Sequence, residues 1–141
     1  MTLDARFQLR KDVMAAEGCQ CKPYRDSVGV LTIGYGRNLD DVGISKLEAE
    51  VLLDHDLADA ERACRQSFDW FDALSNTRQR VLVEMCFNLG MPRLRGFGKM
   101  LAAIKAKDFP MAAREMLASR WALQVKGRAD RLAAAMRDGT A

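Results

Sequence analysis

The chain has 141 residues and a mass of 15.8 kDa, which is the size of one domain. Hydrophobic residues make up 49% of it, enough for a packed core, and no apolar run is long enough to cross a membrane. A net charge of +3 suits either an ordinary mixed surface or attraction to an anionic polymer. Because the basic residues are scattered and no binding motif is present, we expect no nucleic-acid partner.

The cysteines and the N-terminal sequence bear on the compartment and on metal binding. The chain starts without an apolar signal core, so we expect a cytoplasmic protein, or one released by other machinery, with its four cysteines as free thiols. Cys19 and Cys21 could not easily pair with each other if their segment is extended. The single histidine, His55, and the cysteine spacings offer too few ligands for zinc. We therefore predict no metal and no cofactor.

Residues 4–17 are predicted to form a helix with Asp4 as its N-cap and Gly18 as its C-terminal stop. Its apolar residues fall in two rows at helical spacing, which suggests burial on more than one side. Glu17 would then lie at the negative end of the helix dipole, where the protonated form of a carboxyl group is favoured. A general acid needs that form. Without other signals, however, Glu17 would be an ordinary surface residue.

Residues 20–36 are predicted to form a β-hairpin. Asp26 and Gly29 occupy the first and fourth positions of a type I turn, and Thr32 lies on the alternating strand that follows. Each of these residues has a common structural explanation when taken alone. Asn38–Ile44 is expected to be a short polar link.

The rest of the chain is predicted to be helical. Ser45 and Glu48 form a capping box for a helix that runs to about Ser67, long enough to connect two lobes. Its predicted inner residues are Leu47, Val51, Leu53, Leu57, Ala60 and Cys64. An aromatic-rich segment at residues 68–74, with Trp70 and Phe71 as core anchors, precedes helices predicted at residues 76–89, 97–105, from 108 onward and 126–136.

Glu17, Asp26 and Thr32 together suggest a specific chemistry. Two carboxylates that flank a cleft can hydrolyse a glycosidic bond, because one protonates the leaving oxygen and the other acts as nucleophile or activates water. Which of these the second carboxylate does depends on the distance between the carboxyl groups. Spacing in the sequence does not give this distance.

Two blocks of motif residues cover nearly the whole chain. The first is Glu17-Gly18, Tyr24 and Asp26, Gly29, and Thr32-Ile33-Gly34-Tyr35-Gly36; the second is Phe87 and Gly90, Gly96-Phe97, Ala112-Ala113, Ser119-Arg120-Trp121, Gln124, and Arg128-Ala129 with Arg131. They resemble the phage-type lysozymes, the family of the T-even phage enzyme. The resemblance implies one α+β, mainly α domain over residues 1–141. A small hairpin lobe (about 12–50) would be joined by a long helix to a helical lobe (about 51–141) that also includes the N-terminal helix. A shorter link after the hairpin predicts a reduced small lobe.

The resemblance also assigns roles to individual residues. It makes Glu17 the general acid and Asp26 the group that activates water, with Thr32 holding that water, which implies inversion at the sugar carbon. It places Phe87, Asn88 and Asn38 at the substrate, with Arg128 and Gln124 as supporting residues and Arg128 near the acid. Met100 and Glu115 fall at cleft positions where the T-even enzyme has other residues. An ion pair is predicted between Arg37 and Asp56, and Trp121 is expected in the core.

The implied activity is that of a lysozyme that cleaves the β-1,4 bond between N-acetylmuramic acid and N-acetylglucosamine in bacterial peptidoglycan. The expected protein is a monomer of the host cytoplasm that reaches the wall through a holin or on a phage tail, without inserting in the membrane. Three alternatives remain open: a wall-binding module that has lost catalysis, a structural tail component, and an enzyme that cleaves a chitin-like polymer.

Overall fold

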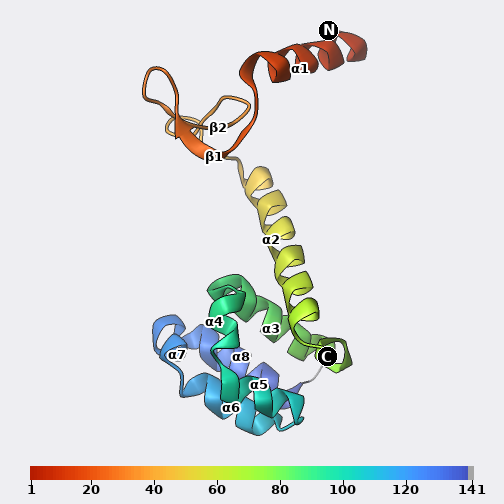
Figure 1. Cartoon of the computed structure of the whole chain (residues 1–141), viewed down its shortest axis with the longest axis vertical. Helices are drawn as coiled ribbons and strands as arrows, with labels where there is room; N and C mark the ends of the chain where they lie inside the picture. Colours follow the sequence, from red (N-terminus) through yellow and green to blue (C-terminus); the bar gives the residue numbers. More distant parts are fainter. Residues whose placement is uncertain (140–141) are drawn as a thin grey trace. The chain divides into compact units, whose positions relative to one another are not determined.

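The computed structural model describes residues 1–139, which form a mainly α protein with one small antiparallel sheet (Figure 1). This confirms the predicted fold class. The chain divides into two compact units, unit 1 (Met1–Val51) and unit 2 (Leu52–Ala141), and each is described by itself. Helix α2 (Lys46–Ser67) contributes residues to both units. Among residues 1–139 no helix is long and apolar enough to cross a membrane.

Unit 1 begins with helix α1 (Leu3–Glu17), which ends at Gly18 as predicted. Its N-cap is Thr2, whose hydroxyl accepts a hydrogen bond from the Ala5 amide at 3.2 Å, and not Asp4. None of its residues is buried, which differs from the burial predicted from its two apolar rows. The physical reason lies in unit 1 itself, whose short strands do not pack along this helix (Figure 1).

The sheet has the order β1-β2-β3, with β1 at Gln20–Arg25, β2 at Leu31–Gly34 and β3 at Arg37–Asn38. The predicted turn is confirmed, since the Gly29 amide donates to the Asp26 carbonyl at 3.0 Å. Asn38, the second residue of β3, was expected to begin a polar link. Two residues are too short for a strand pattern, and their pairing with Thr32 and Ile33 of β2 makes them a strand.

The predicted capping box at the start of α2 is confirmed. The Glu48 amide donates to the Ser45 hydroxyl at 3.1 Å, and the Ser45 amide donates to Glu48 Oε2 at 2.8 Å. The predicted ion pair between Arg37 and Asp56 is wrong, because Arg37 is bound to Glu48 through two hydrogen bonds of 2.7 and 2.8 Å. The capping box turns the Glu48 side chain back toward the N-terminus of the helix, within reach of β3.

Unit 2 holds the hydrophobic core, which is built from the C-terminal part of α2 and the helices that follow. These are the 3₁₀ turn η1 (Phe71–Ala73), α3 (Asn76–Leu89), α4 (Met91–Arg95), α5 (Gly98–Lys105), α6 (Phe109–Leu117), α7 (Arg120–Val125) and α8 (Gly127–Asp138). Buried side chains from all of these elements form one cluster, which includes Phe71, Leu82, Met116 and Leu132. The buried core of residues 1–139 therefore lies in unit 2, where it stabilises the helices that carry the pockets described below.

Several details of unit 2 differ from the sequence predictions. Ser75 caps α3, whereas Asn76 was expected to be its cap. The short helices α4 and α7 were not predicted, because neither is long enough to show periodicity. Of the predicted inner residues of α2, Ala60 and Cys64 are buried, whereas Leu47, Val51, Leu53 and Leu57 are exposed. Phe71 is fully buried as predicted, but Trp70 is only partly buried and stacks on Phe68.

Candidate active site

Glu17 is the last residue of α1, and its carboxylate lies against the backbone of Gly36. A Cβ atom added to Gly36 would be 2.8 Å from Glu17 Oε2, closer than real contacts allow. Gly36 also has a φ of 76°, which disfavours any side chain there. The glycine after β2 therefore leaves room for the carboxylate, and it brings the helix end beside the sheet.

Asp26 holds the turn between β1 and β2 with one of its two carboxylate oxygens. Its Oδ1 accepts hydrogen bonds from the amides of Val28 and Val30, at 3.0 and 2.9 Å. Its Oδ2 accepts none from the residues that the structure describes, and the residue is partly exposed. One oxygen thus fixes the carboxylate, and the other stays available to a water molecule.

Thr32 is linked to Asp26 through Val30. The Thr32 hydroxyl donates to the Val30 carbonyl at 2.8 Å, and the Asp26 amide donates to the same carbonyl at 3.0 Å. Thr32 is also the only polar residue among 1–139 that is buried, with 4% of its surface exposed. Because its proton is used by the Val30 carbonyl, the hydroxyl oxygen can act only as an acceptor toward a third group.

Asn38 lies on β3 beside Thr32, but its side chain is engaged locally. Its Oδ1 accepts from the Asp41 amide at 2.9 Å, and its Nδ2 donates to the Asp41 carboxylate at 3.0 Å. Substrate binding by Asn38 would have to exchange these bonds for new ones, and it stays a prediction.

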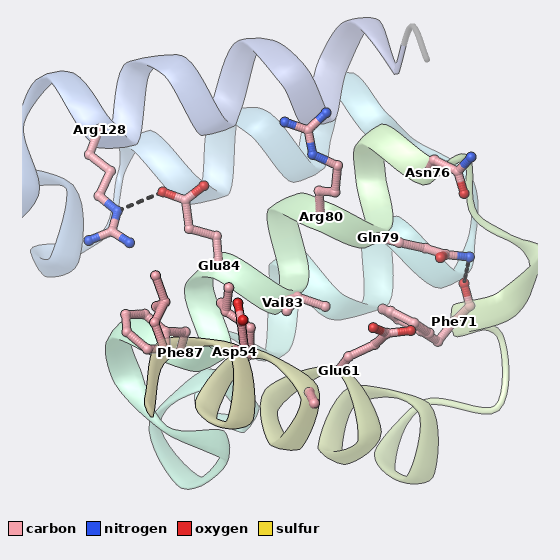
Figure 2. A pocket seen from close by; sticks show the side chains of 13 residues that line it. Asp54, Glu61, Phe71, Asn76, Gln79, Arg80, Val83, Glu84, Phe87 and Arg128 are labelled. Carbon is pink, nitrogen blue, oxygen red and sulfur yellow. Dashed lines mark hydrogen bonds and ion pairs between the residues drawn. The ribbon is translucent and has the colours of Figure 1, made fainter. Parts of the chain in front are cut away.

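Phe87 and Arg128 line a pocket of about 820 Å³ within unit 2, between α2, α3 and α8 (Figure 2). Glu84 lies between them, and it accepts hydrogen bonds from Arg128 Nε at 2.9 Å and from Arg131 Nη2 at 2.6 Å. The sequence offered no local signal for this carboxylate, since its partners are more than forty residues away. Glu17 belongs to unit 1, so the proximity of Arg128 to Glu17 stays a prediction.

The charge state of Glu84 is set by two opposing effects. Partial burial raises the pKa of its carboxyl group, but hydrogen bonds from Arg131 and from Arg128 outweigh the burial and hold the pKa below its ordinary value. Glu84 is therefore ionised at neutral pH. It neutralises part of the positive charge that Arg128 would otherwise present to this pocket.

A second pocket of about 820 Å³ in unit 2 contains other residues that the sequence had singled out. Its lining includes Gln124, Met100, Glu115 and Trp121. Met100 is fully buried, so only a small part of it borders the pocket, whereas Gln124 is exposed. The structure therefore separates two predicted residues, since Phe87 lines the first pocket and Gln124 the second.

Asn88 lies beside the second pocket and orients its tryptophan. Trp121 is buried as predicted, with its ring edge-on to Phe97, and its indole N–H donates to Asn88 Oδ1 at 2.8 Å. The acceptor of the Asn88 amide is thus used by the protein, and its NH₂ group is the part left for a ligand.

The arrangement in unit 1 suits acid–base chemistry by carboxylates. A helix end, a turn and a strand bring Glu17, Asp26 and Thr32 to one small sheet, and one oxygen of Asp26 has no partner among the described residues. Among residues 1–139 no group of three or more histidine, cysteine, aspartate or glutamate side chains could hold a metal ion. Two carboxylates at one small sheet are the kind of side chains that glycoside-cleaving hydrolases use.

Comparison with known proteins gives the family. The model of the family described as "Phage lysozyme" matches residues 14–136. The pre-baseplate central spike protein Gp5 of Enterobacteria phage T4 is 31% identical over 88% of the chain, which spans 26% of that protein. A probable T4-type lysozyme 1 of Dictyostelium discoideum is 26% identical over 88% of the chain and 90% of its own length. This chain belongs to the phage lysozyme family.

Family membership confirms the resemblance drawn from the two motif blocks, and it supports a glycosidase of the muramidase type. The match begins three residues before Glu17 and therefore includes the three residues expected in catalysis.

Proposed function

We propose that this chain hydrolyses the β-1,4 bond between N-acetylmuramic acid and N-acetylglucosamine, with inversion at the sugar carbon. The supporting observation is the Asp26 carboxylate, which is fixed by two backbone amides through one oxygen while the other is open. A base that activates water needs both a fixed position and a free lone pair. Family membership supports the same assignment.

In the proposed reaction each of the three residues has one role. Glu17 donates its proton to the glycosidic oxygen as the bond to the sugar carbon breaks. A water molecule attacks the opposite face of that carbon, and its proton passes to Asp26. The Thr32 hydroxyl accepts a hydrogen bond from this water. Glu17 is left ionised and Asp26 protonated, and exchange with solvent restores both.

The substrate contacts proposed for unit 2 use groups that the protein leaves open. These are the exposed ring of Phe87, the NH₂ group of Asn88 and the side chain of Gln124. Amide donors and acceptors match the acetamido groups of both sugars, and an aromatic ring can pack on a sugar face. In unit 1, Asn38 is a weaker proposal, because both ends of its amide are bound to Asp41.

The first test is the fall in turbidity of permeabilised Gram-negative cells, with the wild type beside Glu17→Gln and Asp12→Asn. Asp12 is an exposed carboxylate on the same helix and serves as the matched control. We expect lysis by the wild type and by Asp12→Asn, and none by folded Glu17→Gln. No lysis by a folded wild type would favour the wall-binding alternative, and equal lysis by all three would refute the role of Glu17.

Inversion is tested by NMR of the new reducing end on a soluble peptidoglycan fragment. An inverting enzyme releases the α-anomer first, and retention would give the β-anomer. The same assay with a chitin oligosaccharide tests the alternative substrate, since faster cleavage of chitin would overturn the proposed specificity.

The proposed substrate lies outside the cell membrane, so the protein needs a route to the wall. We propose a monomer that accumulates in the host cytoplasm and acts once a holin opens the membrane, with carriage on a phage tail as the second route. The likeness to a central spike protein supports the second route. Bacterial cells that express the protein alone should stay intact, and they should lyse when a pore-former is added. Light scattering of the purified protein measures its oligomeric state.

A further inference from the structure

The four cysteines form two pairs with opposite surroundings. Cys19 and Cys21 are exposed at the start of β1, and their sulfur atoms are 3.9 Å apart. Cys64 and Cys86 are buried between α2 and α3, where burial above all raises the pKa of the Cys64 thiol to about 12. The buried pair is therefore inert toward ions in solution, whereas the exposed pair is open to them.

The backbone explains why the exposed thiols meet. In an extended segment, residues two apart point to the same side. The side chains of Cys19 and Cys21 therefore lie on one side of the strand, and that of Gln20 lies on the other. The pKa of Cys21 is raised, first by its hydrogen bond with Cys19. This shared proton reflects the same proximity. Both sulfur atoms are thus presented to solvent side by side.

The lack of further donors decides which ion the pair suits. No third histidine, cysteine, aspartate or glutamate joins the two thiols among residues 1–139, and structural zinc needs four protein ligands. Copper(I) is selected by soft sulfur ligands. Metal–thiolate bonds are about 2.3 Å long, so one ion can bond to both sulfur atoms across this separation.

We propose that Cys19 and Cys21 form a two-thiolate binding site for copper(I). Each thiol releases its proton to solvent as its sulfur donates an electron pair to the ion, and no atom is oxidised or reduced. The site lies two residues beyond the proposed acid Glu17, separated from it by Gly18. It is independent of lysis, because it uses no residue of the proposed reaction.

The test is an anaerobic competition for copper(I) between the reduced full-length protein and bicinchoninate, whose coloured copper(I) complex loses absorbance as the protein binds. We expect one ion per chain. Cys19→Ser and Cys21→Ser should each weaken binding at least about 100-fold, because a single thiolate loses the advantage of a linked second ligand. Glu17→Gln, which should abolish lysis, should bind copper(I) like the wild type.

A second measurement separates the two cysteine pairs without mutating the core. Copper(I) should protect Cys19 and Cys21 from alkylation by iodoacetamide, as read by mass spectrometry, and should leave Cys64 and Cys86 unreactive with or without the ion. Wild-type affinity in Cys19→Ser, or equal alkylation of the exposed pair with and without copper(I), would overturn the proposal. Circular dichroism verifies that each variant is folded.

Discussion

Asp26 has two functions on two different oxygen atoms. Oδ1 accepts the Val28 and Val30 amides and so holds the turn, while Oδ2 is proposed to take a proton from water. Substitution can separate these functions, because an asparagine side chain keeps one acceptor oxygen and loses the base.

Asp26→Asn should therefore fold like the wild type and lose at least about 100-fold in turnover, the usual contribution of a general base. Asp26→Ala should lose the same activity and also about 1 to 3 kcal/mol of unfolding free energy, since two turn amides lose their acceptor. Urea denaturation and turbidity assays measure the two effects. Near wild-type lysis by Asp26→Asn would exclude the proposed role.

Glu48 gives a prediction about pH. Hydrogen bonds from Arg37, followed by that from the Ser45 amide, lower the pKa of its carboxyl group from 4.5 to about 2. Because the pKa of Glu48 is lower in the folded state than in the unfolded chain, ionised Glu48 stabilises the folded state. This stabilisation is complete at pH values above about 4.5 and is lost as the pH falls toward about 2. An NMR titration of the Glu48 carboxyl carbon should place its midpoint near 2. A midpoint near 4.5 would mean that neither partner binds it in solution.

At the scale of elements, the Arg37–Glu48 pair joins β3 to the first turn of α2. Double-mutant cycles distinguish it from the pair predicted from the sequence. Arg37→Ala combined with Glu48→Ala should be less destabilised than the sum of the single changes, whereas Arg37→Ala combined with Asp56→Ala should be additive. Thermal or urea unfolding supplies the four free energies of each cycle. Coupling to Asp56 would restore the original prediction.

Trp121 and Asn88 form a second link between elements, α7 and α3. Asn88→Ala removes the acceptor of a buried indole N–H, which should cost about 1 to 3 kcal/mol of unfolding free energy. Gln124→Ala changes an exposed amide on the same helix as Trp121 and should stay within about 0.5 kcal/mol of the wild type. Equal stability of both variants would indicate that the hydrogen bond contributes nothing.

The elements that the sequence predicted well carry local signals. The turn at Asp26, the capping box at Ser45 and the stop at Gly18 each depend on residues a few positions apart. The contacts that it missed join distant residues. Glu84 meets Arg128 and Arg131 only after α3 and α8 pack, and no periodicity within either helix indicates it. The same limit applies to the candidate site, whose residues were recognised by motif and not by distance.

At the scale of the molecule, buried apolar side chains are distributed unevenly. The core cluster extends from Ala60 to Met136, and Thr32 is the only buried residue of unit 1 among residues 1–139. Native-state hydrogen exchange should therefore be slowest for amides of α3 and α8 and much faster for those of β1 and β2. Equal protection in both regions would show that unit 1 is stabilised by contacts beyond its own.

Gly36 couples two positions that are nineteen residues apart. The space that a side chain at 36 would need is occupied by the carboxylate of Glu17. In a laboratory selection for lysis, revertants of Gly36→Ala should return mainly to glycine, because glycine combines the space for the carboxylate with an unstrained backbone at this positive φ. In a descendant that has lost the carboxylate at position 17, a side chain at position 36 would no longer meet it. Position 36 could then drift toward asparagine, the side chain that best tolerates a positive φ. Among descendants of this chain, glycine at position 36 should therefore accompany an acid at position 17, and other residues at 36 should accompany its loss.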